Sequence, residues 1–205
     1  MSRKEHWERV YTASPADRLG WYEPHLQTSL AWIRELNLPS DARIIDVGGG
    51  ASTLVDDLLD AGYRSITVLD ISEHALSSVQ ARLGARAHLV TWLEGDVTST
   101  DLRTHHYDLW HDRAVFHFLT APEERRRYRE ALLRALKPGG HLIIATFAPD
   151  APPTCSGLPV ERYSPEKLQI ALGGEFELER THKEVHVTPG GVRQAYLYCQ
   201  FYRAA

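Results

Sequence analysis

The sequence predicts a doubly wound α/β fold, in which a mostly parallel sheet is covered by helices on both faces. Three observations lead to this prediction. Short apolar, β-branched segments recur along the chain, and each of the first ones is followed by a stretch with helical periodicity. Glycines or acidic residues stand where several of these segments end. The last third instead alternates as two strands around Thr188–Gly191, which indicates an antiparallel hairpin at one edge of the sheet.

The length and composition fit one domain. The chain has 205 residues, of which 43% are hydrophobic, and this is enough to bury a sizeable core. Two domains would each be too small for the alternation of strands and helices described above. We therefore expect residues 1–205 to form a single domain, with residues 1–40 as a helical lid segment and residues 41–205 as the core.

The first predicted strand begins at Arg43 and breaks into three glycines before a helix over residues 53–59. Such glycines let the backbone turn sharply and let a ligand approach N–H groups at a helix N-terminus. Asp46 precedes the first glycine by two positions, where a carboxylate would attract an ammonium group and repel a pyrophosphate. The pattern favours S-adenosylmethionine (SAM) over NAD, with a plain strand-to-helix turn as the alternative. The loop residues expected to contact SAM are Asp46, Gly48, Gly49, Gly50 and Ser52.

The second predicted strand, Ser65–Asp70, also ends in an acid. A carboxylate at this position can accept hydrogen bonds from both hydroxyls of a ribose. Ile71 follows it, and no arginine stands there to bind a 2′-phosphate. The alternative role for Asp70 is to cap the next helix, but Ser72 is better suited to cap a helix over Glu73–Leu83.

The third predicted strand, at residues 89–93, leads into Asp96 and Val97. Asp96 is positioned to accept a hydrogen bond from the adenine amine, and Val97 to cover the adenine ring.

The remaining expected elements are a strand at Tyr107–Asp112, a helix ending at Leu136, a turn at Leu136–Gly140, a strand at His141–Phe147, a helix from Ser164 to Gly173, and strands at Phe176–Val187 and Gln194–Tyr202.

With these motifs in place, the chain resembles the class I SAM-dependent methyltransferases over roughly residues 40–202. The resemblance implies a Rossmann-like, seven-stranded sheet of order 3-2-1-4-5-7-6 with an antiparallel last strand. It also implies SAM as cofactor and S-adenosylhomocysteine (SAH) as product. Ser52 departs from the glycine that is usual in this family. The matching segments are Asp46–Ser52, Asp70, Glu94–Val97, the fourth strand and Lys137–Gly140.

Three side chains near the end of the fourth strand are candidates to orient or deprotonate the methyl acceptor. Asp112 is the first choice, with His111 and His117 next, because carboxylates and imidazoles are common general bases. His111 is also counted among the cofactor contacts. Neighbouring strand residues point to opposite sides, so only one of His111 and Asp112 should face the acceptor. The alternatives are a structural pairing of Asp112 with Arg113 or another loop residue, and a packed core position for His117.

Aromatic residues precede the first strand and include Trp21 and Tyr22. We expect them to form part of a lid that excludes water and stacks on the sulfonium or the acceptor, with ordinary packing against the sheet as the alternative. Little else is appended to the core apart from the loop at residues 148–163, which favours a small-molecule acceptor. A cavity closed by Trp21, Tyr22 and the Cys155 loop would support this, whereas an open channel to Asp112 would indicate a lysine acceptor.

Two other functions remain open at this stage. The lead segment and Asp112 are loosely similar to a subgroup of methyltransferases that includes eukaryotic protein lysine methyltransferases, so a protein lysine substrate is the second hypothesis. A SAM-binding module without transfer activity is the third.

The composition also bears on partners and location. A net charge of −4 gives no electrostatic basis for nucleic-acid or membrane-surface binding. No apolar run approaches the roughly 18 residues of a membrane span, and the first residues lack a signal sequence. The two cysteines, Cys155 and Cys199, are too few for a disulfide framework, so we expect a cytoplasmic protein. No metal site is expected, because the histidines lack companion ligands, and the oligomeric state is not predicted.

Overall fold

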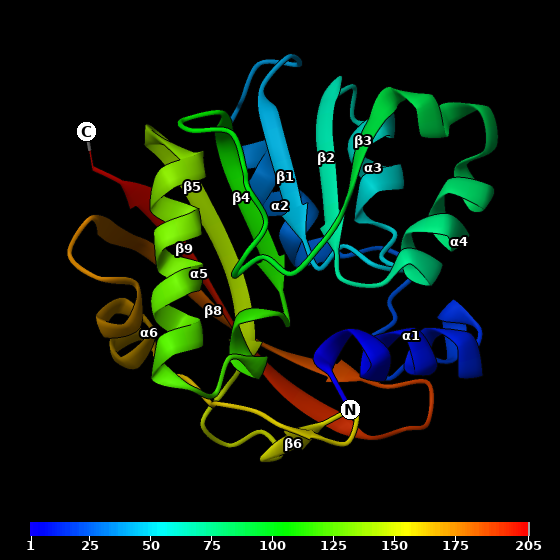
Figure 1. The fold of residues 1–205 in the computed structure, drawn as a ribbon. Coiled ribbons are helices and arrows are strands. Elements are labelled where there is room, and N and C mark those ends of the chain that lie inside the picture. The colour runs from blue at the N-terminus through cyan, green and yellow to red at the C-terminus, as the bar shows by residue number, and fades with distance from the viewer. Residues whose placement is uncertain (205) are drawn as a thin grey trace.

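The computed structural model describes residues 1–204 and contains a seven-stranded sheet (Figure 1). The strand order is β3-β2-β1-β4-β5-β9-β8, with β1 to β5 parallel and β9 antiparallel to both β5 and β8. This confirms the predicted order, because β8 and β9 are the sixth and seventh strands of the sheet along the chain. The bounds are β1 Arg43–Val47, β2 Ser65–Asp70, β3 Val90–Glu94, β4 Tyr107–Arg113, β5 Leu136–Phe147, β8 Phe176–Val187 and β9 Arg193–Arg203.

Helices lie on both faces of the sheet. Ile44 packs in an apolar cluster with α2, α3 and α4, whereas the next residue, Ile45, packs in a cluster with α5 and α6. Figure 1 shows α5 in front of the sheet and α2 behind it. Burial on both faces explains why the central strands are continuous apolar runs. The helices are α1 Arg3–Ala13, α2 Gln27–Glu35, α3 Leu54–Asp60, α4 Glu73–Leu83, α5 Pro122–Ala135 and α6 Pro165–Leu172.

Several shorter elements connect these parts. Within residues 1–204, no helix is both long and apolar enough to cross a membrane. The 3₁₀ turns are η1 Ala16–Arg18, η2 Gly84–Leu89 and η3 Phe116–Phe118, and a small hairpin pairs β6 Thr154–Cys155 with β7 Leu158–Pro159.

The helix ends follow the local sequence signals. The Ser72 hydroxyl accepts a hydrogen bond from the Ala75 N–H at the start of α4, as predicted. Ser164 caps α6 in the same way, through the Lys167 N–H, and Pro165 occupies the first helical position. Gly173 ends α6 with a φ of +93°, a conformation that glycine adopts without strain.

The start of β5 differs from the prediction. The sequence predicts a turn at residues 136–140 before the strand, but β5 already begins at Leu136, which pairs with Tyr107 of β4. The pairing then shifts by the time His141 lies opposite Leu109, and Gly139 has a φ of +79°. The glycines therefore make an irregular entry into the strand rather than a separate turn.

Candidate functional site

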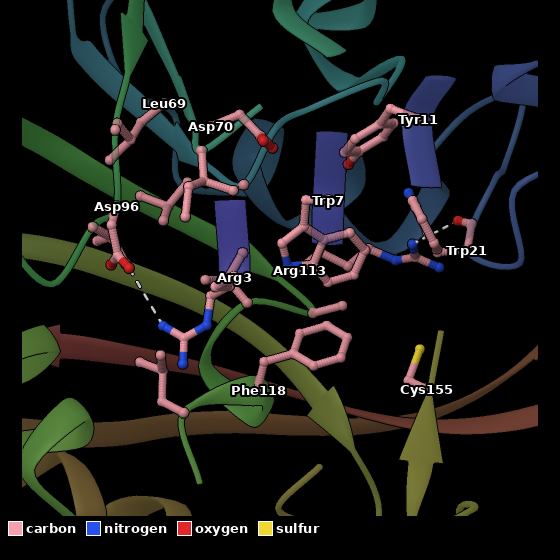
Figure 2. A pocket seen from close by; sticks show the side chains of 18 residues that line it. Arg3, Trp7, Tyr11, Trp21, Leu69, Asp70, Asp96, Arg113, Phe118 and Cys155 are labelled. Carbon is pink, nitrogen blue, oxygen red and sulfur yellow. Dashed lines mark hydrogen bonds and ion pairs between the residues drawn. The ribbon is translucent and has the colours of Figure 1, made fainter. Parts of the chain in front are cut away.

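The carboxyl ends of the parallel strands border a cavity that α1 covers (Figure 2). The cavity contains about 760 Å³ of empty space, its mouth included. Its walls are contributed by α1, the segment around Trp21, the ends of β1, β2 and β4, and the β6 hairpin. The predicted site residues that line it are Trp21, Gly48, Asp70, Ile71, Asp96 and Val97.

A second, smaller pocket adjoins the first one beside the glycine loop. Trp21, Gly48 and Arg113 line both pockets, so the two spaces meet at the end of β4. The predicted site residues that line the second pocket are Trp21, Tyr22, Asp46, Gly48, Gly49, Ser52 and His111.

The glycine loop is tightly packed. A Cβ on Gly48, which has a φ of +67°, would lie 2.0 Å from Val115 Cγ2, and a Cβ on Gly49 would lie 2.8 Å from Asp46 Oδ2. The expectation that the loop N–H groups face a ligand is not met at these two glycines. The N–H groups of Gly48 and Gly49 both donate to the Leu69 carbonyl, at 2.7 and 3.3 Å. The glycines therefore bring β1 and β2 together, and their missing side chains leave room for Val115 and Asp46.

Asp46 is buried beside His111. Its Oδ1 lies 2.7 Å from His111 Nδ1, and His111 Nε2 lies 2.9 Å from the Ser29 hydroxyl. Asp46 Oδ2 is buried without a hydrogen-bond partner among the described residues. Buried acceptors are rarely left unpaired, so this oxygen suits an ammonium donor in the second pocket. Both ring nitrogens of His111 are engaged, and the ring orients Asp46 instead of reaching into the main cavity.

Asp70 lies at the end of β2, under α1. Its Oδ1 accepts a hydrogen bond from the Ser72 N–H at 2.8 Å. Burial raises the pKa of Asp70 to about 7, although the hydrogen bond from Ser72 acts in the opposite direction. The Tyr11 side chain from α1 covers this region, because a Cβ on Gly50 would lie 2.3 Å from the Tyr11 hydroxyl. Figure 2 shows Tyr11 and Asp70 facing the same part of the cavity.

Asp96 marks the opposite end of the cavity. Its Oδ1 accepts hydrogen bonds from the N–H and the hydroxyl of Thr98, at 2.8 and 2.7 Å. Its Oδ2 lies 3.4 Å from an Nη atom of Arg3, which Figure 2 marks with a dashed line. Val97 and Ile71 add apolar surface between the two acids. This end can hold a ring that offers an exocyclic amine.

Polar contacts fix α1 over the strand ends. Glu8 accepts hydrogen bonds from the Ser72 hydroxyl at 3.0 Å and from the Glu73 N–H at 2.7 Å, and so places a negative charge at the N-terminus of α4. Lys4 forms an ion pair with Glu94 at the end of β3. These contacts hold the α1 side chains Trp7 and Tyr11 against the cavity.

The structure places Asp112 away from both pockets. It is fully buried, with Oδ1 accepting from the Val115 N–H at 2.9 Å and from the Phe116 N–H at 3.4 Å. Its Oδ2 accepts from the Tyr128 hydroxyl at 2.6 Å. Burial raises the pKa of Asp112 to about 6, against the hydrogen bond from Tyr128. These contacts favour the structural alternative, although the partners are the η3 turn and α5 rather than Arg113.

His117 is also fully buried away from the cavity. Its Nδ1 accepts a hydrogen bond from the Phe147 N–H at 3.1 Å, and its ring packs against the rings of Phe118 and Phe147. Burial lowers the pKa of His117 to about 3, so the ring is neutral. As expected, His111 and Asp112 diverge, but neither of them, nor His117, borders the main cavity.

A comparison with known protein families identifies the central part of the chain. A family model described as a methyltransferase domain matches residues 45–144, from the glycine loop through β4 to the middle of β5. The chain is a class I SAM-dependent methyltransferase. Binding of SAM and SAH is typical of this class of methyltransferase.

Sequence relatives of the methyltransferase include protein lysine methyltransferases. It is 25% identical over 151 residues to an eEF1A lysine and N-terminal methyltransferase from Danio rerio, covering 72% of this chain and 22% of the relative. It is 24% identical over 171 residues to EEF1A lysine methyltransferase 2 from Homo sapiens, covering 71% of this chain and 68% of the relative. The match thus spans only about a fifth of the length of the first relative.

Solved structures share the fold over nearly the whole chain. One comes from work on the conversion of a disulfide bond into a thioacetal group during echinomycin biosynthesis. It has a TM-score of 0.78 and is 19% identical, and the alignment covers 99% of this chain and 93% of the chain in that structure. Another is 1,6-didemethyltoxoflavin-N1-methyltransferase from Burkholderia thailandensis with its substrate and SAH, with a TM-score of 0.74, 19% identity and coverage of 98% and 88%. At this identity the likeness shows the fold alone.

Trp7, Phe118 and Arg113 line the methyltransferase site but were not among the predicted site residues, whereas Trp21 was. Trp7, Trp21 and Phe118 form an aromatic wall, with ring centroids 5.6 Å apart for Trp7 and Trp21 and 5.0 Å apart for Trp7 and Phe118. Arg113 completes this wall at the end of β4 and pairs with Glu23 at 2.7 Å. The aromatic residues before β1 were the available signal, whereas the Arg113–Glu23 pairing joins segments 90 residues apart.

Proposed function

We propose that this methyltransferase transfers the methyl group of SAM to a small-molecule acceptor. The observation that carries the proposal is the cavity under α1, which Trp7, Trp21 and Cys155 line together with the strand ends. Apolar and aromatic side chains of this kind can surround a small acceptor, whereas a peptide substrate needs a channel for a long side chain. Asp112, which would have marked such a channel, is buried away from the cavity.

We also propose how SAM is held. Asp46 Oδ2 accepts from the SAM ammonium group, with His111 orienting the carboxylate from its other oxygen. The Asp70 carboxylate accepts from the ribose hydroxyls, and Asp96 accepts from the adenine amine beside Val97. The further residues proposed to border the cofactor are Trp21, Tyr22, Gly48, Gly49, Gly50, Ser52 and Ile71.

The protein then contributes to the reaction mainly by positioning the methyl donor and the acceptor. SAM supplies an activated methyl group, and holding donor and acceptor at about 3–3.5 Å can contribute about 7–11 kcal/mol to the barrier reduction. The aromatic wall of Trp7, Trp21 and Phe118 orients a flat acceptor and keeps the reacting atoms dry. The three predicted bases lie outside the cavity, so this geometry suits an acceptor that is nucleophilic without a strong protein base.

Methylation of a protein lysine is the second candidate. It is supported by the sequence relatives, which are eEF1A lysine methyltransferases at 24–25% identity. A lysine amine would need the α1 cover to open, since Trp7 and Tyr11 lie over the strand ends.

The two functions are separated by following the methyl group. The purified enzyme is incubated with SAM labelled on the methyl group, once with a small-molecule filtrate of cell extract and once with the protein fraction. We expect label in a small product and SAH release that depends on the filtrate. Label in protein alone would contradict the proposal and favour the lysine substrate. An Asp70→Asn variant, which loses the ribose contact, is the control and should reduce labelling in either fraction.

A further inference from the structure

Arg113 is a buried cation that faces both pockets. Its side chain is 5% exposed, and it is the last residue of β4, where the two pockets meet. Its Nε donates to the Tyr198 hydroxyl at 3.0 Å, one Nη to the Trp21 carbonyl at 2.9 Å, and the other Nη to Glu23 at 2.7 Å. A guanidinium has five N–H donors, so two of them have no partner within residues 1–204.

The carboxylate beside Arg113 has a second partner. Glu23 is shared between Arg113 and His186 of β8, whose Nδ1 lies 2.9 Å from the same Glu23 oxygen. His186 Nε2 lies 2.8 Å from the Gly20 carbonyl. The Glu23 carboxylate therefore does not contact Arg113 alone.

Glu23 is held in its ionised form. Burial acts to raise the pKa of Glu23, but the hydrogen bond from His186 and the charge of Arg113 lower it overall. The Arg113 guanidinium also lies over the Tyr196 ring, at 4.6 Å from its centroid, which fixes the plane of the guanidinium. Arg113 is therefore held in one orientation beside both pockets, with two N–H donors that have no partner within residues 1–204.

We propose that Arg113 binds a carboxylate or a similar delocalised oxyanion of the methyl acceptor, so that the enzyme acts on small, flat apolar acids. This inference rests on the proposed small-molecule function and names the class of its substrate. A guanidinium fork matches the planar geometry of a carboxylate, and the pairing is strong where water is excluded. The aromatic wall of Trp7, Trp21 and Phe118 suits the flat apolar body of such an acid. A cationic acceptor would be repelled.

Binding of model ligands tests the proposal without a known acceptor. The SAH-loaded enzyme is titrated with benzoate, benzyl alcohol and benzylamine, which are similar in size and differ in charge. Binding is followed by calorimetry and by the fluorescence of Trp7 and Trp21, which line the cavity. We expect benzoate to bind at least tenfold more tightly than benzyl alcohol, and benzylamine to bind most weakly. Equal affinities, a preference for benzylamine, or no binding of benzoate would overturn the proposal.

Two variants should change the preference in opposite directions. Arg113→Met should abolish the preference for benzoate, whereas Glu23→Gln removes the compensating carboxylate and should strengthen benzoate binding. The midpoint of urea unfolding, measured on the same samples, reports whether each variant keeps its fold. If Arg113→Met fails to fold, Glu23→Gln alone tests the proposal. Unchanged or weaker benzoate binding in that variant would contradict carboxylate binding by Arg113.

Failure of this inference differs from failure of the proposed function. Label transferred only to protein would remove the small-molecule function, whatever the model ligands do. Label transferred to small molecules that are neutral or cationic would leave that function standing and overturn the role of Arg113 alone.

Discussion

Replacement of Asp112 distinguishes a structural carboxylate from a catalytic one. The side chain accepts from two backbone N–H groups and from the Tyr128 hydroxyl, and all of these groups are buried with it. Asp112→Asn keeps an acceptor for the backbone and removes the charge. Asp112→Ala leaves the donors unpaired, at a cost of about 1–3 kcal/mol for each buried group. We therefore expect Asp112→Ala to unfold about 2–4 kcal/mol more easily than Asp112→Asn.

The raised pKa of Asp112 also predicts how the free energy of unfolding depends on pH. The pKa of Asp112 is about 6 in the fold, against an ordinary value of 3.8 for an aspartate. Because the folded state binds the proton more tightly, the contribution of Asp112 to stability is full below its unfolded pKa and is lost as the pH rises through 6. A difference of about two pKa units corresponds to roughly 3 kcal/mol. The amide introduced by Asp112→Asn does not titrate, so this variant should gain stability relative to the wild type between about pH 4 and pH 7.

Urea unfolding of the wild type and both variants at about pH 4, 5.5 and 7 measures these differences. Methyl transfer per bound SAM is measured on the same proteins once an acceptor is known. We expect Asp112→Asn to keep its turnover within a few-fold of the wild type. A loss of about 10²–10⁴ in kcat with unchanged stability and SAM affinity would refute the structural role and restore Asp112 as the general base.

Two further predictions concern the cofactor end and its cover. Asp70→Asn should weaken SAM binding by about 1.5–3 kcal/mol in calorimetry, as expected for hydrogen bonds to a charged group. The wild-type affinity should fall as the pH drops below about 7, where Asp70 takes up a proton, while the variant stays flat and SAH binds about as well as SAM. Glu8→Ala removes the contacts of α1 with the start of α4 and should speed hydrogen exchange of the α1 amides, whereas exposed Arg9→Ala should not. Unchanged exchange in Glu8→Ala would show that other contacts hold α1.

The fold could be predicted from the sequence because its signals are local. The bounds of β2, α4 and β8 agree with the prediction, since local signals mark their ends. β2 is an apolar run that ends at Asp70. Ser72 and Gly84 cap α4, and β8 ends before Thr188. The predicted start of β5 was wrong because the Pro-Gly-Gly segment at residues 138–140 is a turn signal by composition. It lies between Leu136 and His141, which pair with Tyr107 and Leu109 of β4, and so forms an irregularity within the strand.

The cofactor end of the site was within reach of the sequence, because the ends of parallel strands meet at one edge of the sheet. Asp70 and Asp96 border one cavity as that rule requires. The acceptor end of the site could not be predicted from the sequence, because hydrogen-bond partners on distant elements decide where a side chain lies. Asp112 is hydrogen-bonded to Tyr128 of α5, away from the cavity, and His111 is hydrogen-bonded to Ser29 of α2. The sequence pattern gives the face of a strand but not these partners.

A crystal structure of the complex with SAH tests the central claim most directly. The account predicts SAH in the cavity under α1, with its adenine beside Asp96, its ribose on Asp70 and its amino group on Asp46 Oδ2. It also predicts that the sulfur points toward the aromatic wall of Trp7, Trp21 and Phe118. SAH bound elsewhere, or bound with its amino group away from Asp46 and its sulfur away from that wall, would contradict it.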